Sequence, residues 1–189
     1  MKIINKFFHK LKIFVYRNFL SRAKLIQGRP QIKQPALFLG KGEIVFEKDV
    51  KIGYFPSPKF YSTYAHIEAR DAKSTIFIGK GTVINNDFTA IAYKSHIKIG
   101  NKCLIGSSVE ILSSDFHNIE PADRWNSVVP PISYDVILGD NVWVGNSAKI
   151  LKGVSVGDNA VIAAGSIVVK NVPPNVVVAG NPAIEVKKL

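Results

Sequence analysis

The chain has 189 residues, of which 47% are hydrophobic and 21% charged, and its formal net charge at pH 7 is +11. This composition is ordinary for a soluble protein, and the length suits one domain with a continuous core. A single cysteine excludes an internal disulfide framework.

Residues 1–30 carry most of the positive charge. They contain eight Lys and Arg residues and no acidic residue, which leaves +3 for the remaining chain. Because that remainder lacks the basic stripe of a nucleic-acid-binding protein, we expect no nucleic-acid partner. Apolar residues recur in this segment at rough helical spacing, and lysines interrupt them too often for a spanning helix. We predict a basic amphipathic N-terminal helix within residues 1–30, without the features of a signal peptide.

Two roles are open for this helix. A basic amphipathic helix can lie on an anionic bilayer, which would place residues 1–25 of a cytoplasmic protein at the inner membrane surface. It can also pack on an open end of the fold or on another subunit and cover unpaired strand edges. Both roles are compatible if the apolar stripe docks on protein and the lysines face lipid.

Residues 36–77 are less regular. Residues 40–44 and 50–53 look like imperfect turns of a coil, and residues 54–58 interrupt them with a proline-rich turn. Residues 66–70 resume the coil. The segment either caps the core or lines a pocket for an acceptor molecule.

A six-residue spacing dominates the C-terminal half. It places aliphatic side chains at Leu138, Val144, Ile150, Val156, Ile162 and Val168, and upstream at Ile99, Ile105 and Ile111. This period is neither that of a helix nor that of a lone strand. It predicts short strands joined by sharp corners that wind into a prism, with Leu138 stacked on Val156 one 18-residue turn later. Glycine after several of these aliphatics suits a corner. We predict a parallel β-solenoid over residues 65–180.

The repeat stops after Ile111 and returns at Leu138. The residues between form an excursion loop, about 113–136, in an otherwise periodic coil. Long loops on rigid scaffolds usually carry function. The loop contains one histidine, His117, and Asp115 lies two positions before it.

Four segments carry a family resemblance: IGNKCLIGSSVEI (99–111), SSDFH (113–117), residues 137–175 and AGNPA (179–183). With them the chain resembles the hexapeptide-repeat acyltransferases, in the branch that contains maltose and galactoside O-acetyltransferases and capsule or lipopolysaccharide O-acetyltransferases. The resemblance implies an all-β fold, a left-handed parallel β-helix over residues 31–189. It also implies a homotrimer with active sites between subunits.

The resemblance makes His117 the catalytic base. Transfer of an acyl group to a sugar hydroxyl requires a group that takes the hydroxyl proton, and an imidazole that titrates near neutrality can do so. Asp115 could fix the tautomer of that imidazole, and a backbone carbonyl could do so equally well.

Further site residues follow from the resemblance alone. Asn85 is expected to hold the acceptor, with Asn86 or Asp87 in its place if the register shifts, or else to be a stacked structural asparagine. Arg124 of the excursion loop is also assigned to acceptor binding. The positions expected along the acyl donor are Trp143, Asn146, Ala164, Val169 and Lys170. Trp143 could equally be a subunit contact, and Lys170 a solvated lysine.

The donor that this resemblance implies is acetyl-CoA, as a co-substrate and without a metal. The chain has no phosphate-binding glycine loop of the nucleotide-binding types. Cys103 occupies a small inward position of the repeat, so we expect a packing thiol rather than a nucleophile. The expected activity is therefore O-acetylation of a carbohydrate, a surface glycan or its precursor, by direct attack.

Three alternatives belong to other classes. An N-acetyltransferase acting on an amino-sugar nucleotide is the nearest. A zinc hydratase on the same coil would need three histidines around the metal, and the four histidines here include no close pair. A non-enzymatic solenoid would need a regular polar array on one face and would leave the excursion loop unexplained.

Overall fold

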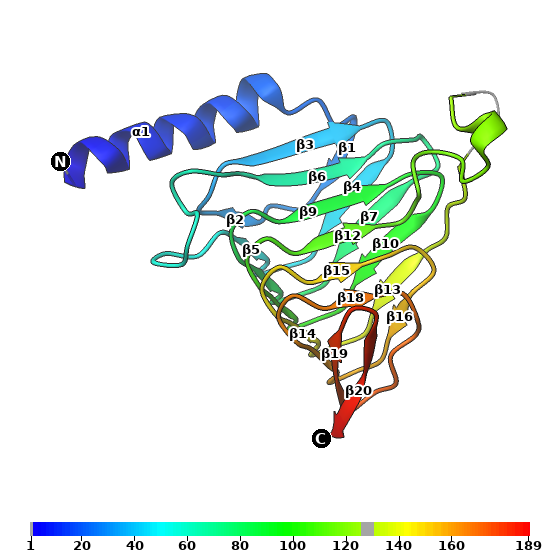
Figure 1. Cartoon of the computed structure of the whole chain (residues 1–189). Coiled ribbons are helices and arrows are strands. Elements are labelled where there is room, and N and C mark those ends of the chain that lie inside the picture. Colours follow the sequence, from blue (N-terminus) through cyan, green and yellow to red (C-terminus); the bar gives the residue numbers. More distant parts are fainter. Residues whose placement is uncertain (1, 126–130) are drawn as a thin grey trace.

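The computed structural model describes residues 2–125 and 131–189. Its body is a parallel β-helix whose chain passes through three sheets in turn, one on each side of a prism (Figure 1). Each strand inside the coil therefore pairs with the strands one turn before and one turn after it, and the last strand pairs antiparallel with the strand that precedes it. The prism narrows toward the C-terminus (Figure 1).

The three sheets, named A, B and C here, contain all the strands of the described chain. Sheet A consists of β1 (Leu25–Gln27), β4 (Glu43–Phe46), β7 (Thr75–Ile78), β10 (His96–Ile99), β13 (Val136–Leu138) and β16 (Ser155–Val156). Sheet B consists of β2 (Gln31–Ile32), β5 (Lys51–Ile52), β8 (Val83–Ile84), β11 (Leu104–Ile105), β14 (Trp143–Val144), β17 (Val161–Ile162), β19 (Val176–Gly180) and β20 (Ala183–Lys188). Sheet C consists of β3 (Ala36–Gly40), β6 (Ala65–Ala69), β9 (Thr89–Ala92), β12 (Glu110–Leu112), β15 (Lys149–Ile150) and β18 (Ile167–Val168).

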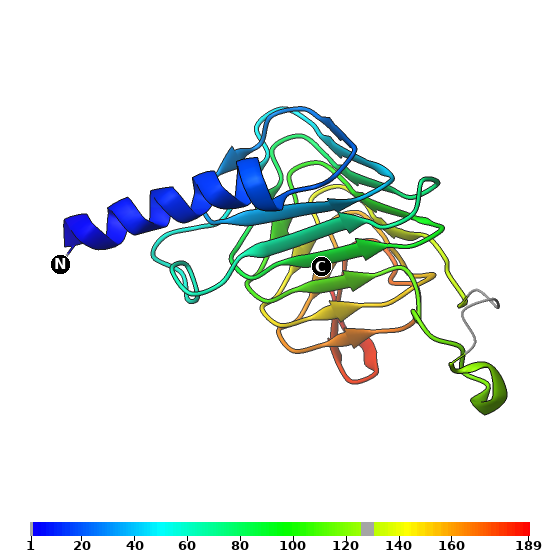
Figure 2. The ribbon, with the colours of Figure 1, turned by 90° about the horizontal axis from the view of Figure 1, so that it is seen from above.

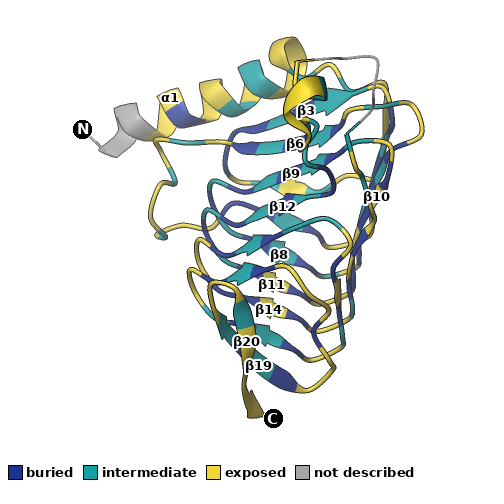
Figure 3. Cartoon of the chain, turned by 45° about the vertical axis from the view of Figure 1, so that its right-hand side comes forward, coloured by how far each residue is buried: buried dark blue, intermediate teal, exposed yellow. Residues whose placement is uncertain are grey.

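The predicted stacking of aliphatic residues is confirmed. Leu138 pairs with Val156, Val144 with Ile162, and Ile150 with Val168. These side chains are buried inside the prism, and so are the small residues two positions before them, such as Ala148 and Ala160. Figure 3 shows the resulting alternation of buried and accessible residues along strands such as β6 and β12.

The β-helix begins earlier than predicted. Its first strand, β1, pairs with β4, so the coil includes residues that the sequence left outside the 65–180 solenoid. The first strands of sheet C have five residues against two in β15, and the aromatic rings of Phe38 and Phe46 pack inside this wider end at 5.6 Å. Longer strands and aromatic core residues break the six-residue spacing. In the sequence these turns therefore look imperfect.

The glycines of the repeat have a different role from the one predicted. Left-handed backbone at the corners falls on residues such as Asn141, Ser147 and Asn159, with φ of 55°, 59° and 60°. The glycine after Val144 is required instead by close approach of the next turn. A Cβ at Gly145 would lie 2.5 Å from the backbone nitrogen of Ala164, closer than real Cβ contacts come.

The predicted N-terminal helix is present but shorter than the 30 residues allotted to it. It comprises α1 (Lys2–Val15) and a π-helical turn, η1 (Tyr16–Leu20), and projects beyond the coil (Figures 1 and 2). Phe7, Leu11 and Phe14 are exposed, so the expectation that the apolar stripe docks on the coil is wrong for this chain. In residues 2–125 and 131–189, every helix is too short or too polar to cross a bilayer.

Candidate active site

Hydrogen bonds join the two ends of the excursion loop where it leaves and rejoins the coil. It starts after β12 at buried Ser113, whose Oγ lies 2.7 Å from the Oγ of Ser95 and whose carbonyl accepts a hydrogen bond from the Tyr134 nitrogen at 3.0 Å. An isolated antiparallel bridge joins Ser114 to Ser133. The loop extends from the side of the prism opposite to α1 and contains a 3₁₀ turn, η2 (Pro121–Asp123) (Figures 1 and 2). Its residues 126–130 lie outside the described residues.

His117 lies near the start of this loop with an exposed side chain. The residue before it, Phe116, has left-handed backbone with φ of 62°, and its nitrogen donates to the Ser114 hydroxyl at 3.1 Å. Across the described chain, the His117 ring has no hydrogen-bond partner. An exposed imidazole on an anchored loop is accessible to a substrate.

Sheet C supports the residue that precedes His117. The guanidinium carbon of Arg70 lies 4.7 Å from the Phe116 ring centroid, within the range of a cation–π contact. Arg70 is held by Glu68 through two hydrogen bonds, Nε to Oε1 at 2.8 Å and Nη2 to Oε2 at 3.0 Å. These bonds lower the pKa of Glu68 and raise the pKa of Arg70. His66 contacts the same carboxylate at 3.1 Å.

Sequence reasoning missed this network. His66, Glu68 and Arg70 alternate along β6, with Arg70 immediately after it, so their side chains share the outer face of sheet C. That alternation of charged groups was the available signal. Its link to Phe116 was not visible, because the two residues lie far apart in the sequence.

Asp115 does not pair with His117 in this structure. Its Oδ1 lies 2.6 Å from the Nζ of Lys152, which follows β15, and no described atom hydrogen-bonds the buried Oδ2. The carboxylate therefore ties the loop to the next turn of the coil. Its suggested effect on the tautomer of His117 stays a prediction.

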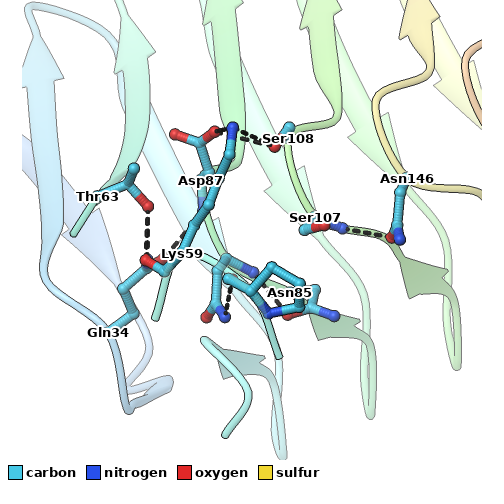
Figure 4. Close-up of polar contacts among 10 residues, drawn as sticks. Gln34, Lys59, Thr63, Asn85, Asp87, Ser107, Ser108 and Asn146 are labelled. Atoms are coloured by element: carbon cyan, nitrogen blue, oxygen red, sulfur yellow. Dashed lines mark hydrogen bonds and ion pairs between the residues drawn. The ribbon is translucent and has the colours of Figure 1, made fainter. Parts of the chain in front are cut away.

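Three of the four residues expected at the acceptor, Asn85, Asn86 and Asp87, lie between β8 and β9, at the corner between sheets B and C. Figure 4 shows Asn85 and Asp87 at this corner. Asn86 is fully buried, and its Nδ2 lies within hydrogen-bond distance of the carbonyls of Tyr54, Ser57 and Pro58, while its Oδ1 accepts from the Tyr54 nitrogen. This corrects the suggestion that Asn86 binds an acceptor, because its amide is committed to holding the 54–58 loop.

The neighbours of Asn86 are partly accessible. Asn85 donates from Nδ2 to the Ser57 hydroxyl at 3.0 Å. The Oδ2 of Asp87 lies 2.6 Å from the Nζ of Lys59 and 2.9 Å from the hydroxyl of Ser108 (Figure 4). The Asp87 charge is therefore largely compensated, and the Oδ1 of Asn85 accepts a hydrogen bond from the Asn86 nitrogen at 2.8 Å.

Two of the donor-binding candidates share that corner. Asn146 is exposed and its Oδ1 accepts from the Ser107 nitrogen at 2.9 Å (Figure 4). Ala164 follows β17, one turn later in sheet B, and is also exposed.

Trp143 lies on the outer face of sheet B beside Leu104, its pairing partner. Both side chains are 55% exposed. This pair forms an apolar strip on a surface that faces solvent in the single chain.

The remaining candidates lie at the other edge of sheet C. Val169 and Lys170 follow β18 and are exposed, at the edge from which the excursion loop departs. Arg124 lies within that loop, where its Nη2 donates to the carbonyl of Ile119 at 3.1 Å.

One chain does not bring the two groups together. Asn146 and Lys152 mark the opposite edges of sheet C and are six residues apart, so extended chain separates the edges by about 20 Å. The group around His117 and the group around Asn85 are therefore on opposite edges of sheet C, and Trp143 lies on sheet B beyond the Asn85 edge.

Cys103 is a packing residue, as predicted. Its side chain is fully buried and the Sγ lies 3.2 Å from the carbonyl oxygen of Gly139. Burial raises the pKa of the Cys103 thiol, which disfavours the nucleophilic thiolate. Among residues 2–125 and 131–189, no three His, Cys, Asp or Glu side chains are grouped so that they could hold a metal ion.

Residues 135–170 match the family model described as bacterial transferase hexapeptide (six repeats). The chain therefore carries the hexapeptide repeat of this transferase family over these residues. It is 38% identical over 116 residues to the galactoside O-acetyltransferase of Escherichia coli K12, an alignment that covers 61% of this chain and 55% of the relative. It is 39% identical over 118 residues to the polysialic acid O-acetyltransferase of Escherichia coli O1:K1, covering 61% of this chain and 37% of the relative.

The fold of this hexapeptide-repeat chain also matches a solved structure. The crystal structure of the polysialic-acid-specific acetyltransferase NeuO superimposes with a TM-score of 0.63 and 28% identity, over 88% of this chain and 83% of the other. The β-helix is accordingly the left-handed form that the sequence resemblance implied. The chain spans less than two thirds of the length of the two relatives from Escherichia coli.

Proposed function

We propose that this protein is an O-acetyltransferase that moves an acetyl group from acetyl-CoA to a hydroxyl of a carbohydrate. The observation that carries the proposal is the exposed His117 on a loop anchored where the hexapeptide repeat is interrupted. The match of residues 135–170 to a transferase family model and the likeness to sugar-acetylating relatives support the reaction class.

His117 is the general base in this proposal. Its imidazole takes the proton of the acceptor hydroxyl as the hydroxyl oxygen attacks the thioester carbonyl carbon. The carbon–sulfur bond then breaks, and the imidazolium returns the proton to the departing thiolate. No covalent enzyme intermediate is required, because both substrates are bound together and proximity supplies much of the acceleration. The buried thiol of Cys103 takes no part.

The active unit is proposed to be a homotrimer. A second subunit would supply the edge that carries Asn85, Trp143, Asn146 and Ala164 to the His117 edge of its neighbour, which one chain cannot do. The exposed strip of Trp143 and Leu104 supports a subunit contact or donor channel on sheet B. Val169 and Lys170 would lie along the donor on the His117 side.

The acceptor class is proposed from the relatives. Galactosides and polysialic acid are the acceptors named for the relatives, and both are carbohydrates. A surface glycan or its precursor fits this range, with Asn85, Asp87 and Arg124 as the proposed acceptor contacts. We place the enzyme in the cytoplasm, with residues 1–25 at the inner membrane surface.

Replacement of His117 tests the proposal. His117→Ala should lower turnover roughly 10²- to 10⁴-fold, measured as thiol release from acetyl-CoA with a panel of sugars, while circular dichroism stays unchanged. His96→Ala is the matched control, because His96 is also exposed and engages Asp135 only through its backbone nitrogen. Wild-type turnover in a folded His117→Ala protein would remove the assigned base. Release with amine-bearing sugars alone would instead favour the N-acetyltransferase alternative.

A further inference from the structure

Four apolar side chains of α1 point away from the protein. Phe7 and Phe14 are 64% and 54% exposed, and Phe8 and Leu11 are exposed as well. At 3.6 residues per turn, Phe7, Leu11 and Phe14 lie on one face of the helix, while His9 lies on the opposite face. An amphipathic helix in a water-soluble protein normally buries its apolar face, so this orientation is reversed.

Contacts on the His9 face hold the helix in that orientation. His9 is buried, its Nε2 lies 2.8 Å from the carbonyl oxygen of Lys33, and its ring centroid lies 4.3 Å from that of Phe60. About two turns further, the rings of Tyr16 and Tyr64 are 5.1 Å apart. Phe60 and Tyr64 belong to the loop between β5 and β6, which lies below α1 in Figure 1. The face of α1 that carries Phe7, Leu11 and Phe14 therefore points away from the N-terminal end of the coil.

More apolar side chains are exposed at the same end. Phe19 of η1 and Leu25 and Ile26 of β1 are exposed, and β1 is the first strand of sheet A, paired only with β4 among the described strands. The ring centroids of Phe14 and Phe19 are 5.9 Å apart, so Phe19 continues the outward face of α1. We term this the end surface, and it consists of Phe7, Phe8, Leu11, Phe14 and Phe19.

Charge distinguishes among partners for this surface. Lys6, Lys10 and Arg17 are exposed along one flank of the apolar face, and residues 1–30 contain eight basic and no acidic residues. A second copy would bring the same positive charge and a net-positive remainder to the contact. An anionic phospholipid surface complements the charge and also offers an apolar phase for the phenylalanines.

We propose that the end surface binds an anionic phospholipid bilayer, with α1 lying in the plane of the interface. The phenylalanines enter the boundary between headgroups and acyl chains, and the flanking Lys and Arg side chains contact the phosphates. The coil axis then points away from the membrane. This inference deepens the peripheral location given under the proposed function, and lipid binding itself requires no acetyl transfer.

Vesicle binding of the full chain tests the proposal without any substrate. Sedimentation with vesicles of phosphatidylglycerol and phosphatidylcholine in equal parts should pellet the protein at least about tenfold more effectively than phosphatidylcholine alone, and added salt should weaken the binding. The triple variant Phe7→Ser, Leu11→Ser, Phe14→Ser should lose about tenfold or more of the binding. A charge variant, Lys6→Gln, Lys10→Gln, Arg17→Gln, should lose a similar factor on the anionic vesicles.

The matched control replaces equally exposed apolar residues at the other end of the coil. Ile184→Ser, Val186→Ser in β20 should bind vesicles as the wild type does. Equal binding to both vesicle types, or full binding by the triple variant, overturns the proposal. The proposal is also overturned if the triple variant binds vesicles as the wild type does but has a lower mass by analytical ultracentrifugation, because the surface would then bind a second copy. Acetyl-CoA turnover with a soluble sugar, measured on the same variants, reports separately on the proposed function.

Discussion

Asn86→Ala tests whether this residue is a structural clamp. The Asn86 NH2 group has two protons and its Oδ1 accepts one from the Tyr54 nitrogen, so the side chain supplies three full hydrogen bonds to the 54–58 loop. At about 1 kcal/mol net for each bond, the substitution should destabilise the fold by about 3 kcal/mol. For a chain of this size that corresponds to a Tm lower by roughly 6–12 °C.

Asn85→Ala is the matched control for that experiment. Asn85 donates one hydrogen bond to the Ser57 hydroxyl and accepts one from the Asn86 nitrogen, so its loss should cost about 2 kcal/mol, while the KM for a sugar acceptor should rise. Thermal unfolding followed by circular dichroism and acceptor kinetics on both variants separate the two roles. An Asn86→Ala protein with wild-type Tm and a raised acceptor KM would refute the clamp and restore Asn86 as an acceptor ligand.

Two further predictions concern the network on sheet C. Arg70→Ala should lower kcat by about 10- to 100-fold with little change in the KM for acetyl-CoA, because Phe116 loses its support and His117 shifts; Arg70→Lys should restore part of the rate, and an unaltered kcat in Arg70→Ala would contradict the positioning role. The Glu68–Arg70 pair should contribute about 1 kcal/mol of stability at neutral pH. Since the pKa of Glu68 is lowered in the fold, the unfolded chain binds its proton at higher pH, so this stability should vanish as pH falls through the acidic range. Denaturant unfolding of Glu68→Gln beside the wild type checks this, and a difference independent of pH would contradict it.

The later turns of the coil were predictable because their determinants are local. Leu138 and Val156 stack because three sides of six residues each complete one turn of the coil. The spacing in the sequence alone therefore fixes which residues lie on top of one another. The first turns were not predictable in this way. Their longer strands and the Phe38–Phe46 pair fill a wider prism without keeping that spacing.

The candidate site likewise contains residues that the local sequence singles out and residues whose role depends on distant parts of the chain. His117 was identifiable because the repeat is interrupted around it, and Cys103 because its place in the repeat faces inward. The difference between Asn85 and Asn86 was not, since the 54–58 loop that occupies Asn86 comes from a distant part of the chain. Nor was the salt bridge that draws Asp115 to Lys152 rather than to His117.

The sequence by itself determined the β-helix, the interruption that carries His117 and the basic, amphipathic character of α1. Only the tertiary structure decided where the apolar face of α1 points, what supports Phe116, and that His117 and Asn85 lie at opposite edges of sheet C. The physical reason is that periodicity specifies contacts between residues at a fixed separation. Contacts made by loops and terminal helices join residues at no fixed separation, and they depend on the packing of the whole chain.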